Sequence, residues 1–308
     1  MCLATAVHSQ DIQIATNGDV EISFQVFGDQ TDPPLVFIDG LATAVRPGGD
    51  ALTEALVAQG FRVVRFDNRD AGQSTVLTDA GAPPSNEVIV ESLMTGTTPP
   101  VAYTLSDMAG DTMAVLDAAG IEQAHVMGAS LGGMIAQTIA TEYPGRTLSL
   151  ISVSSSTGDP DLPFGPAMEA MTAPPAATAE GRVEQYTQLY RAFEGDAFKM
   201  TDAEILARVE ADGAAGDPLA PARQGAAATA SGDRQDRLAS VELPALVIHG
   251  SDDPLFPDSH ADSTAEAVPN GQLEIVDGLG HIVSDAAAGE IASRVATFVN
   301  DLSTSNKE

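Results

Sequence analysis

Residues 125–142 read His-Val-Met-Gly-Ala-Ser-Leu-Gly-Gly-Met-Ile-Ala-Gln-Thr-Ile-Ala-Thr-Glu, and this stretch decides the fold. The pattern predicts a short apolar strand, a turn at Ser130, and a helix over 131–142 that Pro144 ends. A G-x-S-x-G motif between a strand and a helix holds its serine on a strained turn with the hydroxyl exposed. Gly128 and Gly132 let the two backbones pass closely, because neither carries a side chain. Ser130 is therefore the candidate nucleophile.

Strand and helix signals alternate on both sides of this motif. An alternating strand is predicted over 21–28, and apolar strands over 35–38, 62–66, 148–153, 245–250 and 273–276. Helices are predicted over 50–59, 105–119, 259–267 and 286–302. This order indicates an α/β fold with a mostly parallel central sheet of about eight strands, covered by helices on both faces.

Two regions depart from the alternation. Residues 78–104 contain two Pro-Pro pairs, so a loop with little regular structure is expected there. Residues 156–240 show no convincing strand, are rich in Ala, Pro and Gly, and carry short amphipathic pieces over 183–193 and 203–210. We interpret 156–240 as an inserted helical cap, and 1–155 together with 241–308 as the catalytic core.

A serine hydroxyl is a weak nucleophile and needs a general base, which a carboxylate must orient. Of the five histidines, His281 is the candidate base, because it follows the flexible segment 278–280 between a strand and the last helix. Such a loop can lay an imidazole over the carboxyl edge of the sheet. The other histidines are assigned to a loosely held N-terminal arm (His8), the far end of the nucleophile strand (His125), the core (His249) and a solvated helix start (His260).

The carboxylate candidates are Asp252 and Asp253, in a proline-bounded loop directly after a strand. Either side chain can reach His281 from that loop. The plain structural role for one of the two is a turn or a helix cap.

Together these segments resemble the α/β-hydrolase superfamily over essentially the whole chain. The matching segments are 37–41, 65–74, 128–133, 250–257 and 278–281. The chain order Ser, Asp, His is also the order found on that fold. Within the superfamily the sequence is similar to the capped serine carboxylesterases of the aclacinomycin-methylesterase type, which share the Arg-Asp-x-Gly-x-Ser turn present at 69–74.

The resemblance implies roles for particular residues. In the family pattern the acid is the third residue after the strand-ending glycine and directly precedes proline, which selects Asp253 over Asp252. The family's oxyanion donors are the backbone N–H after the nucleophile and one N–H from the loop after the third strand. These two donors map to Leu131 and Leu41.

Two acidic features near the oxyanion loop receive a structural interpretation. Many relatives carry His-Gly where this chain has Asp39-Gly40, and a carboxylate beside an oxyanion hole would oppose the developing charge. We therefore expect Asp39 to be turned away and to tie down the loop. Residues 67–70 are interpreted as a turn that supports this loop. No metal is expected there, because no His or Cys joins the carboxylates.

The predicted chemistry is hydrolysis of small to medium, hydrophobic carboxylic esters through an acyl-enzyme, with water as the second substrate. No cofactor is expected, since no G-x-G-x-x-G follows a strand. Apolar cap residues suit a hydrophobic acyl or alcohol group, namely Phe164, Met168, Met171, Phe193, Phe198 and Met200.

Alternatives with the same triad are proline iminopeptidase, lactonase and C–C-bond hydrolase. For an aminopeptidase, the cap carboxylates Glu180, Glu184 and Glu194 are the candidates to bind a substrate amine. A non-catalytic binding protein on this scaffold is the alternative from another class. The intact Ser, Asp and His set argues against it.

Charge excludes two classes of partner. The 308 residues include 14 Lys plus Arg against 44 Asp plus Glu, for a net charge of −30. Nucleic-acid backbones and anionic membrane surfaces both attract cationic proteins, so neither is an expected partner. A field this negative also favours neutral esters. We attribute the excess carboxylates to a solvated surface adapted to a saline habitat.

The compartment is predicted from absences in the sequence. Cys2 is the only cysteine, so no intrachain disulfide is expected and a reduced cytoplasm fits. Residues 1–10 lack the basic and apolar regions of a signal peptide. No stretch approaches the ~18 apolar residues of a membrane span. A monomer or homodimer is expected.

Overall fold

A computed structural model describes residues 11–46, 48–213 and 217–305. Cys2 and His8 lie outside these residues. The chain forms an eight-stranded sheet with the order β1-β2-β4-β3-β5-β6-β7-β8. Strand β2 runs antiparallel to both of its neighbours, and the remaining pairs are parallel. The strands are β1 Gln13–Asn17, β2 Val20–Phe27, β3 Pro34–Ile38, β4 Arg62–Phe66, β5 Ala124–Ala129, β6 Thr147–Val153, β7 Ala245–Gly250 and β8 Gly271–Val276.

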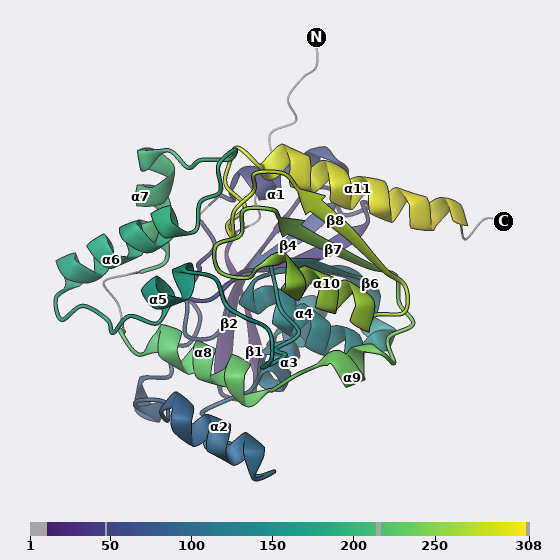
Figure 1. Cartoon of the computed structure of the whole chain (residues 1–308). Coiled ribbons are helices and arrows are strands. Elements are labelled where there is room, and N and C mark those ends of the chain that lie inside the picture. The colour runs from purple at the N-terminus through teal and green to yellow at the C-terminus, as the bar shows by residue number, and fades with distance from the viewer. Residues whose placement is uncertain (1–10, 47, 214–216, 306–308) are drawn as a thin grey trace.

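Helices cover both faces of the sheet (Figure 1). Helix α1 packs against α11 on one face, while α3 packs against α4 on the other, which α10 completes. These helices are α1 Ala51–Ala58, α3 Leu105–Ala118, α4 Leu131–Glu142, α10 Asp258–Ala267 and α11 Ala288–Ser305. A short 3-10 helix, η2 Pro144–Arg146, follows α4. No helix in the described ranges is long and apolar enough to cross a membrane.

The core has two halves because successive strand side chains point to opposite faces. In β3, Val36 packs in the cluster beneath α3 and α4, whereas Leu35 packs in the cluster beneath α1 and α11. In β5, Val126 and Met127 divide in the same way. Both faces are buried, which explains why these strands read as continuous apolar runs.

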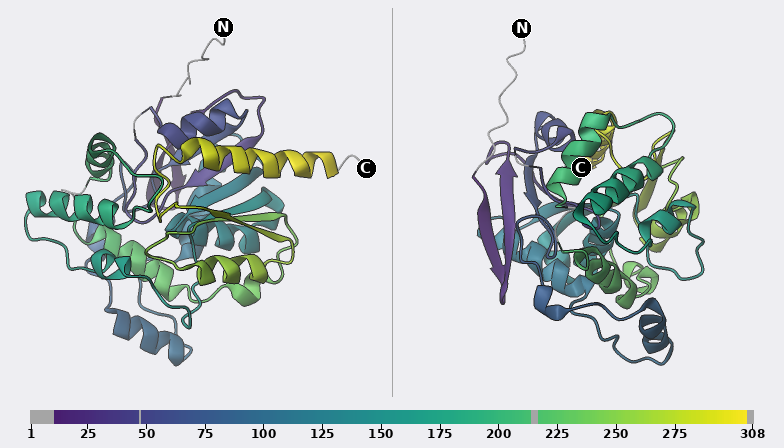
Figure 2. Two further views of the ribbon diagram at one scale, coloured as in Figure 1. Left: turned by 45° about the horizontal axis from the view of Figure 1, so that its top comes forward. Right: turned by 90° about the vertical axis from the view of Figure 1, so that its left-hand side faces the viewer.

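Where the structure describes the segment between β6 and β7, it contains five helices, and residues 156–240 contain no strand there. They are α5 Ala167–Met171, α6 Ala179–Ala192, α7 Asp202–Ala211, α8 Ala220–Ala230 and α9 Gln235–Leu238. Helices α5, α6 and α7 lie together at one side of the sheet, at the left of Figure 1 and of the left view in Figure 2. We keep the name cap segment for residues 156–240, whose boundaries stay a prediction.

The expected loop over 78–104 is wrong in part. It contains the 3-10 helix η1 Thr78–Ala80 and the helix α2 Asn86–Met94, which Ser85 caps by accepting a hydrogen bond from Val88 N–H. The prolines flank α2 rather than interrupt it, so a nine-residue helix fits between them. Helix α2 packs against α8 and projects from the rest of the molecule (Figures 1 and 2).

His260 is also placed differently from its prediction. The side chain is 1% exposed within α10 instead of lying at a solvated helix start. Its Nε2 donates to the carbonyl of Pro163 at 3.0 Å, and its Nδ1 lies 2.9 Å from Ser156 Oγ. The segment that leaves β6 covers this histidine, and burial lowers its pKa. The sequence around His260 does not indicate that a segment about 100 residues earlier buries this side chain.

Candidate active site

Ser130 occupies the sharp turn between the end of β5 and the first residue of α4. Its backbone has φ +53° and ψ −117°, a conformation that is costly for any residue except glycine. Four hydrogen bonds hold the backbone of Ser130. Its N–H donates to Val153 O at 2.9 Å, and its carbonyl accepts from Gly133 N–H at 2.9 Å, Met134 N–H at 3.2 Å and Ser155 Oγ at 2.7 Å. The predicted strand–turn–helix context of the serine is present.

The motif's glycines are required by close packing of backbones. A Cβ atom at Gly128 would lie 2.0 Å from Gly132 O, and one at Gly132 would lie 2.0 Å from Ile38 O. Both distances are far below van der Waals contact, so no side chain fits at either position. The turn is therefore fixed by β3, β5 and α4 together.

The structure brings the three predicted side chains together. Ser130 Oγ lies 3.0 Å from His281 Nε2, and His281 Nδ1 lies 2.9 Å from Asp253 Oδ2. Both are hydrogen-bond distances. The Oδ1 atom of Asp253 accepts from the N–H groups of Leu255 and Phe256 at 2.8 and 2.9 Å. Both carboxylate oxygens are thus engaged, and one of them faces the imidazole.

Asp252 has a different surrounding. Its Oδ2 accepts a hydrogen bond from Asp196 N–H at 3.0 Å, in the segment between α6 and α7. Its Oδ1 accepts one from Ser251 Oγ at 3.2 Å. The carboxylate of Asp252 therefore ties the loop after β7 to the cap segment, and in the described ranges it makes no hydrogen bond or ion pair with His281.

Asp253 is a buried but ionised acid. Burial alone would raise the pKa of Asp253, but the charge of His281 and the hydrogen bond from it outweigh burial and lower that pKa. His249 contributes as well: its Nε2 donates to Phe256 O at 2.7 Å and lies 3.5 Å from Asp253 Oδ2. The ring of His281 is flanked by Phe193 and Phe256, with ring centroids 5.0 and 5.4 Å away. The triad is thus enclosed by apolar rings.

We use the name oxyanion loop for residues 39–45, which contain the predicted donor Leu41 and pass directly beside Ser130. A Cβ atom at Gly40 would lie 3.4 Å from Ser130 Cβ. The N–H of Leu41 follows Gly40, and no acceptor binds it in the part of the chain that the structure describes. The N–H of Leu131 opens α4, so it has no acceptor within the helix. The two predicted donors thus belong to backbone segments that lie next to Ser130.

Asp39 is turned onto a buried arginine, in agreement with its structural interpretation. Its carboxylate accepts hydrogen bonds from Arg65 NH2 at 2.9 and 2.6 Å. The NH1 atom of Arg65 lies 3.0 Å from both oxygens of Asp50. Arg65 is 1% exposed and stacks over the ring of Phe37 at 4.5 Å. The negative charge of Asp39 is therefore compensated away from the nucleophile.

The turn at 67–70 supports the same loop. Asn68 Nδ2 donates to Asp39 O at 3.1 Å, and Asp67 Oδ1 accepts from Val45 N–H at 2.7 Å. The other oxygen of Asp67 accepts from Gln73 N–H at 2.8 Å. Burial raises the pKa of Asp67 to about 6 despite these bonds. No group of three or more His, Cys, Asp or Glu side chains suited to a metal ion is found in the described ranges.

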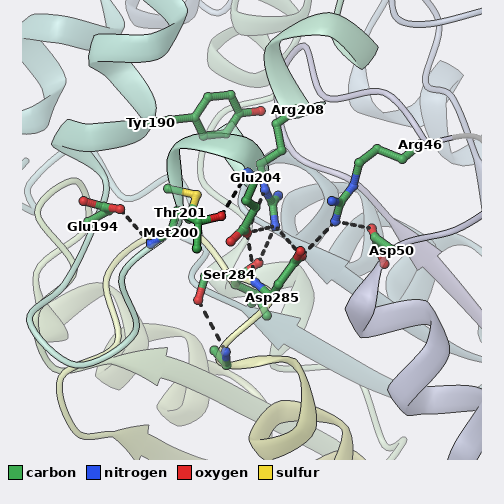
Figure 3. A network of polar contacts seen from close by, with 12 residues as sticks. Arg46, Asp50, Tyr190, Glu194, Met200, Thr201, Glu204, Arg208, Ser284 and Asp285 are labelled. Carbon is green, nitrogen blue, oxygen red and sulfur yellow. Dashed lines mark hydrogen bonds and ion pairs between the residues drawn. The ribbon is translucent and has the colours of Figure 1, made fainter. Parts of the chain in front are cut away.

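Helix α7 of the cap segment binds the loop that follows His281 (Figure 3). Glu204 Oε1 accepts from Asp285 N–H at 2.9 Å and from Arg208 NH2 at 3.0 Å. Arg208 NH2 also donates to Val283 O at 3.0 Å. The carboxylate of Asp285 pairs with Arg46 of the core at 2.9 Å. The histidine loop is thus held between the cap segment and the core.

Several residues that hold the site are missing from the sequence-based prediction. Glu204 and Arg208 bind the histidine loop, and Asp212 and Gln224 bind the oxyanion loop. All four belong to the cap segment. Their partners are far away in the sequence, so no local pattern marks them.

Comparison with known proteins gives concordant matches. The profile of a family described as alpha/beta hydrolase fold matches residues 33–173 and 170–287. Rhodomycin D methylesterase of Streptomyces peucetius is 28% identical over 316 residues, covering 92% of this chain and 96% of that protein. The 3-oxoadipate enol-lactonase 1 of Acinetobacter baylyi is 26% identical over 271 residues, covering 88% and 90%. The solved structure of esterase RhEst1 from Rhodococcus sp. ECU1013 has a TM-score of 0.73 at 22% identity, covering 94% and 99%.

Proposed function

The chain belongs to the alpha/beta hydrolase fold family, and we propose that it hydrolyses carboxylic esters through Ser130, His281 and Asp253. The predicted fold class is confirmed by the family match and by the fold of esterase RhEst1. The predicted enzyme class, a carboxylic ester hydrolase, is confirmed by the family match and the methylesterase relatives. The observation that carries the proposed mechanism is the continuous hydrogen-bonded path from Ser130 Oγ through His281 to Asp253.

In the proposed first half-reaction, His281 Nε2 takes the proton of Ser130 Oγ while that oxygen attacks the ester carbonyl. The N–H groups of Leu131 and Leu41 stabilise the tetrahedral oxyanion. The C–O bond to the alcohol then breaks, and the alcohol leaves with the proton from His281. Asp253 holds the imidazole in the tautomer that accepts this proton and stabilises the imidazolium.

The second half-reaction releases the acid. Water loses a proton to His281 and attacks the acyl-enzyme carbonyl. The same N–H groups stabilise the second oxyanion, and Ser130 leaves as it regains its proton from His281. The products are one carboxylic acid and one alcohol, and no redox step is required.

We propose neutral, apolar esters as the substrate class. The cluster of buried apolar side chains around Phe193 and Phe256 includes partly buried Met134, Met168 and Leu189 at its border. Flexible methionines and rings beside the triad suit a hydrophobic acyl or alcohol group. Of the other predicted cap residues, Met200 is buried in a separate cap cluster. Phe164 is 53% exposed, and its ring centroid lies 5.9 Å from that of Phe256.

Lactones, which are cyclic esters, are a second candidate substrate class, because one relative is named as an enol-lactonase. The aminopeptidase alternative has less support. Glu194 is paired with Arg191 at 2.8 Å, and Glu180 and Glu184 are exposed. A substrate amine needs buried carboxylates that are free to bind it.

Turnover of p-nitrophenyl acetate and butyrate by wild type and by Ser130→Ala tests the proposal. Wild type should hydrolyse both esters. Ser130→Ala should lose on the order of a million-fold in kcat, because no nucleophile remains. A silent wild type, or an alanine variant with full rate, would contradict the proposed function. Parallel assays with γ-lactones and prolyl amides rank the substrate classes.

The neighbouring aspartates offer a matched test of the acid. Asp253→Asn should lower kcat by about 10⁴-fold, because the amide favours the wrong imidazole tautomer. Asp252→Asn keeps an acceptor for Asp196 N–H and should leave kcat within a few-fold of wild type. The reverse ranking would assign the acid to Asp252.

A further inference from the structure

The oxyanion loop contains a backbone conformation that needs outside support. Ala42 has φ +58°, in the left-handed region that residues other than glycine rarely adopt. Its neighbour Leu41 carries the N–H proposed to bind the oxyanion, and Gly40 lies against Ser130. The Ala42 N–H is one peptide unit after the Leu41 N–H, so a displacement at Ala42 would be transmitted to the Leu41 N–H through the φ and ψ torsions of Leu41.

Gln224 of α8 binds the loop at this strained residue. Its Oε1 accepts from Ala42 N–H at 2.7 Å, and its Nε2 donates to Arg69 O at 2.7 Å. The side chain is 0% exposed. One donor and one acceptor are matched to opposite partners, so the amide has a single favourable orientation. Gln224 thereby links the oxyanion loop to the turn that follows β4.

Helix α8 is itself firmly seated. Arg223, the residue before Gln224, pairs with Asp70 through two hydrogen bonds of 2.9 and 2.7 Å and with Asp217 at 2.7 Å. Asp70 also accepts from Tyr103 Oη at 2.7 Å. Buried bidentate pairs of this kind fix orientation as well as distance. The support under Gln224 is thus rigid.

A second cap residue binds the loop two positions further along. Asp212, just after α7, accepts from Ala44 N–H at 3.0 Å and from the hydroxyl of Tyr190 in α6. Val45 N–H donates to Asp67, so the N–H groups of Ala42, Ala44 and Val45 all have side-chain acceptors. The Leu41 N–H, which no acceptor binds within the described ranges, is left available.

We propose that Gln224 is a positioning residue for the oxyanion hole, so that the cap segment sets the orientation of the Leu41 N–H. The catalytic consequence rests on the proposed ester hydrolysis. Gln224 is fully buried, its side-chain hydrogen bonds go to Ala42 and Arg69 rather than to the triad, and it acts through Ala42. The cap segment then has a role in transition-state stabilisation besides any role in substrate selection.

The test substitutes Gln224→Met, which keeps the length of the side chain and removes both hydrogen bonds. With p-nitrophenyl butyrate, kcat should fall about 30- to 100-fold while KM stays within about threefold, since a misplaced donor affects the transition state. Phenylboronic acid should bind more weakly by a similar factor, because its tetrahedral adduct on serine needs the same donor. Gln224→Glu keeps the acceptor for Ala42 and should restore part of kcat.

Gln137→Met is the matched control. Gln137 is equally buried and bonds to Arg234 and Ser152, but it does not contact the oxyanion loop. This variant should lose stability while kcat and boronate affinity stay within about twofold of wild type. If both glutamine variants lose kcat alike, Gln224 has only a general structural role and the inference is wrong.

Hydrogen exchange tests the positioning without relying on esterase activity. In Gln224→Met the backbone amides of 41–45 should exchange faster than in wild type, while those of 128–133 should not change. Unchanged exchange at 41–45 overturns the inference whether or not the protein hydrolyses esters. An active wild type with unchanged kcat in Gln224→Met overturns it as well. A wild type that is silent on every ester contradicts the proposed function alone.

Discussion

The nucleophile turn and the oxyanion loop lie side by side but are held by different means. The turn at 128–133 is held by backbones packed so closely that Gly128 and Gly132 have no room for a Cβ atom. The oxyanion loop is held by side chains, above all by the buried Arg65 between Asp39 and Asp50 and by Gln224 and Asp212 from the cap segment.

The difference shows two ways of fixing strained backbone at the proposed catalytic site. Ser130 and Ala42 both have positive φ. Around Ser130 the constraint is mainly close backbone packing, between the consecutive elements β5 and α4 and against Ile38 O at the end of β3. Around Ala42 the constraint comes from charged and polar groups far away in the sequence. We therefore expect the turn to be sensitive to added volume, and the loop to lost charge and hydrogen bonds.

Removing the central cation should have the largest effect. In Arg65→Met the carboxylates of Asp39 and Asp50 would stay buried without their partner, which typically costs about 3–5 kcal/mol. Urea unfolding at pH 7 measures this loss. The control is Arg294→Met, whose partly exposed pairs with Glu274 and Glu290 should contribute less than about 1 kcal/mol. Equal losses in the two variants would mean that buried charge does not hold the loop.

The second largest loss of stability is expected from adding one methyl group to the turn. In Gly132→Ala the new Cβ atom would lie 2.0 Å from Ile38 O, so β3 and α4 must move apart. Overpacking of this severity is expected to lower the unfolding free energy by about 3 kcal/mol. Gly289→Ala in α11 is the control, because a Cβ atom there meets nothing within 4 Å. If Gly132→Ala unfolds like wild type, the turn does not depend on close backbone packing.

The loop should also respond to pH through Asp212. Burial raises the pKa of Asp212 to about 7. The native state therefore keeps a proton that the unfolded chain loses near pH 4, and the stability from this group is lost as pH rises through 7. Relative to Asp212→Asn, wild type should lose roughly 1–2 kcal/mol of unfolding free energy between pH 4.5 and 7.5, within the linkage limit of about 1.4 kcal/mol per pH unit. Parallel pH curves for the two proteins would contradict this assignment.

The same contrast explains what the sequence could predict. The predicted strands over 62–66 and 245–250 and the helix over 131–142 agree with β4, β7 and α4. These elements, like the turn at Ser130, are encoded by consecutive residues whose spacing shows their geometry. The structure then brings Ser130, His281 and Asp253 together, because each follows a strand at one edge of the sheet.

The parts that were not predicted depend on contacts between distant residues. Nothing near Gln224 indicates that it binds Ala42, and nothing near His260 indicates that residues 156–163 cover it. Helix α2 was not predicted, because the prolines on both sides of this short segment indicate a loop. The helix packs against α8, which follows much later in the chain. Local patterns thus indicate the proposed catalytic groups but not the side chains that hold them.

Salt should separate the buried charges from those on the surface. With a net charge of −30, the solvated carboxylates repel one another, and this repulsion is screened as the Debye length falls from about 10 Å at 0.1 M to about 3 Å at 1 M salt. The melting temperature of wild type should therefore rise by about 5 °C or more between 0.1 and 1 M NaCl, on the order of 1–2 kcal/mol for a chain of this size.

The difference in melting temperature between wild type and Arg65→Met should change little over the same range of salt, because mobile ions do not reach the pairs around Arg65. A flat or falling melting temperature of wild type would remove the saline-habitat hypothesis. A difference that shrinks steadily with salt would show instead that the charges under the oxyanion loop are screened like those of the surface, and that the loop is held mainly by its uncharged hydrogen bonds.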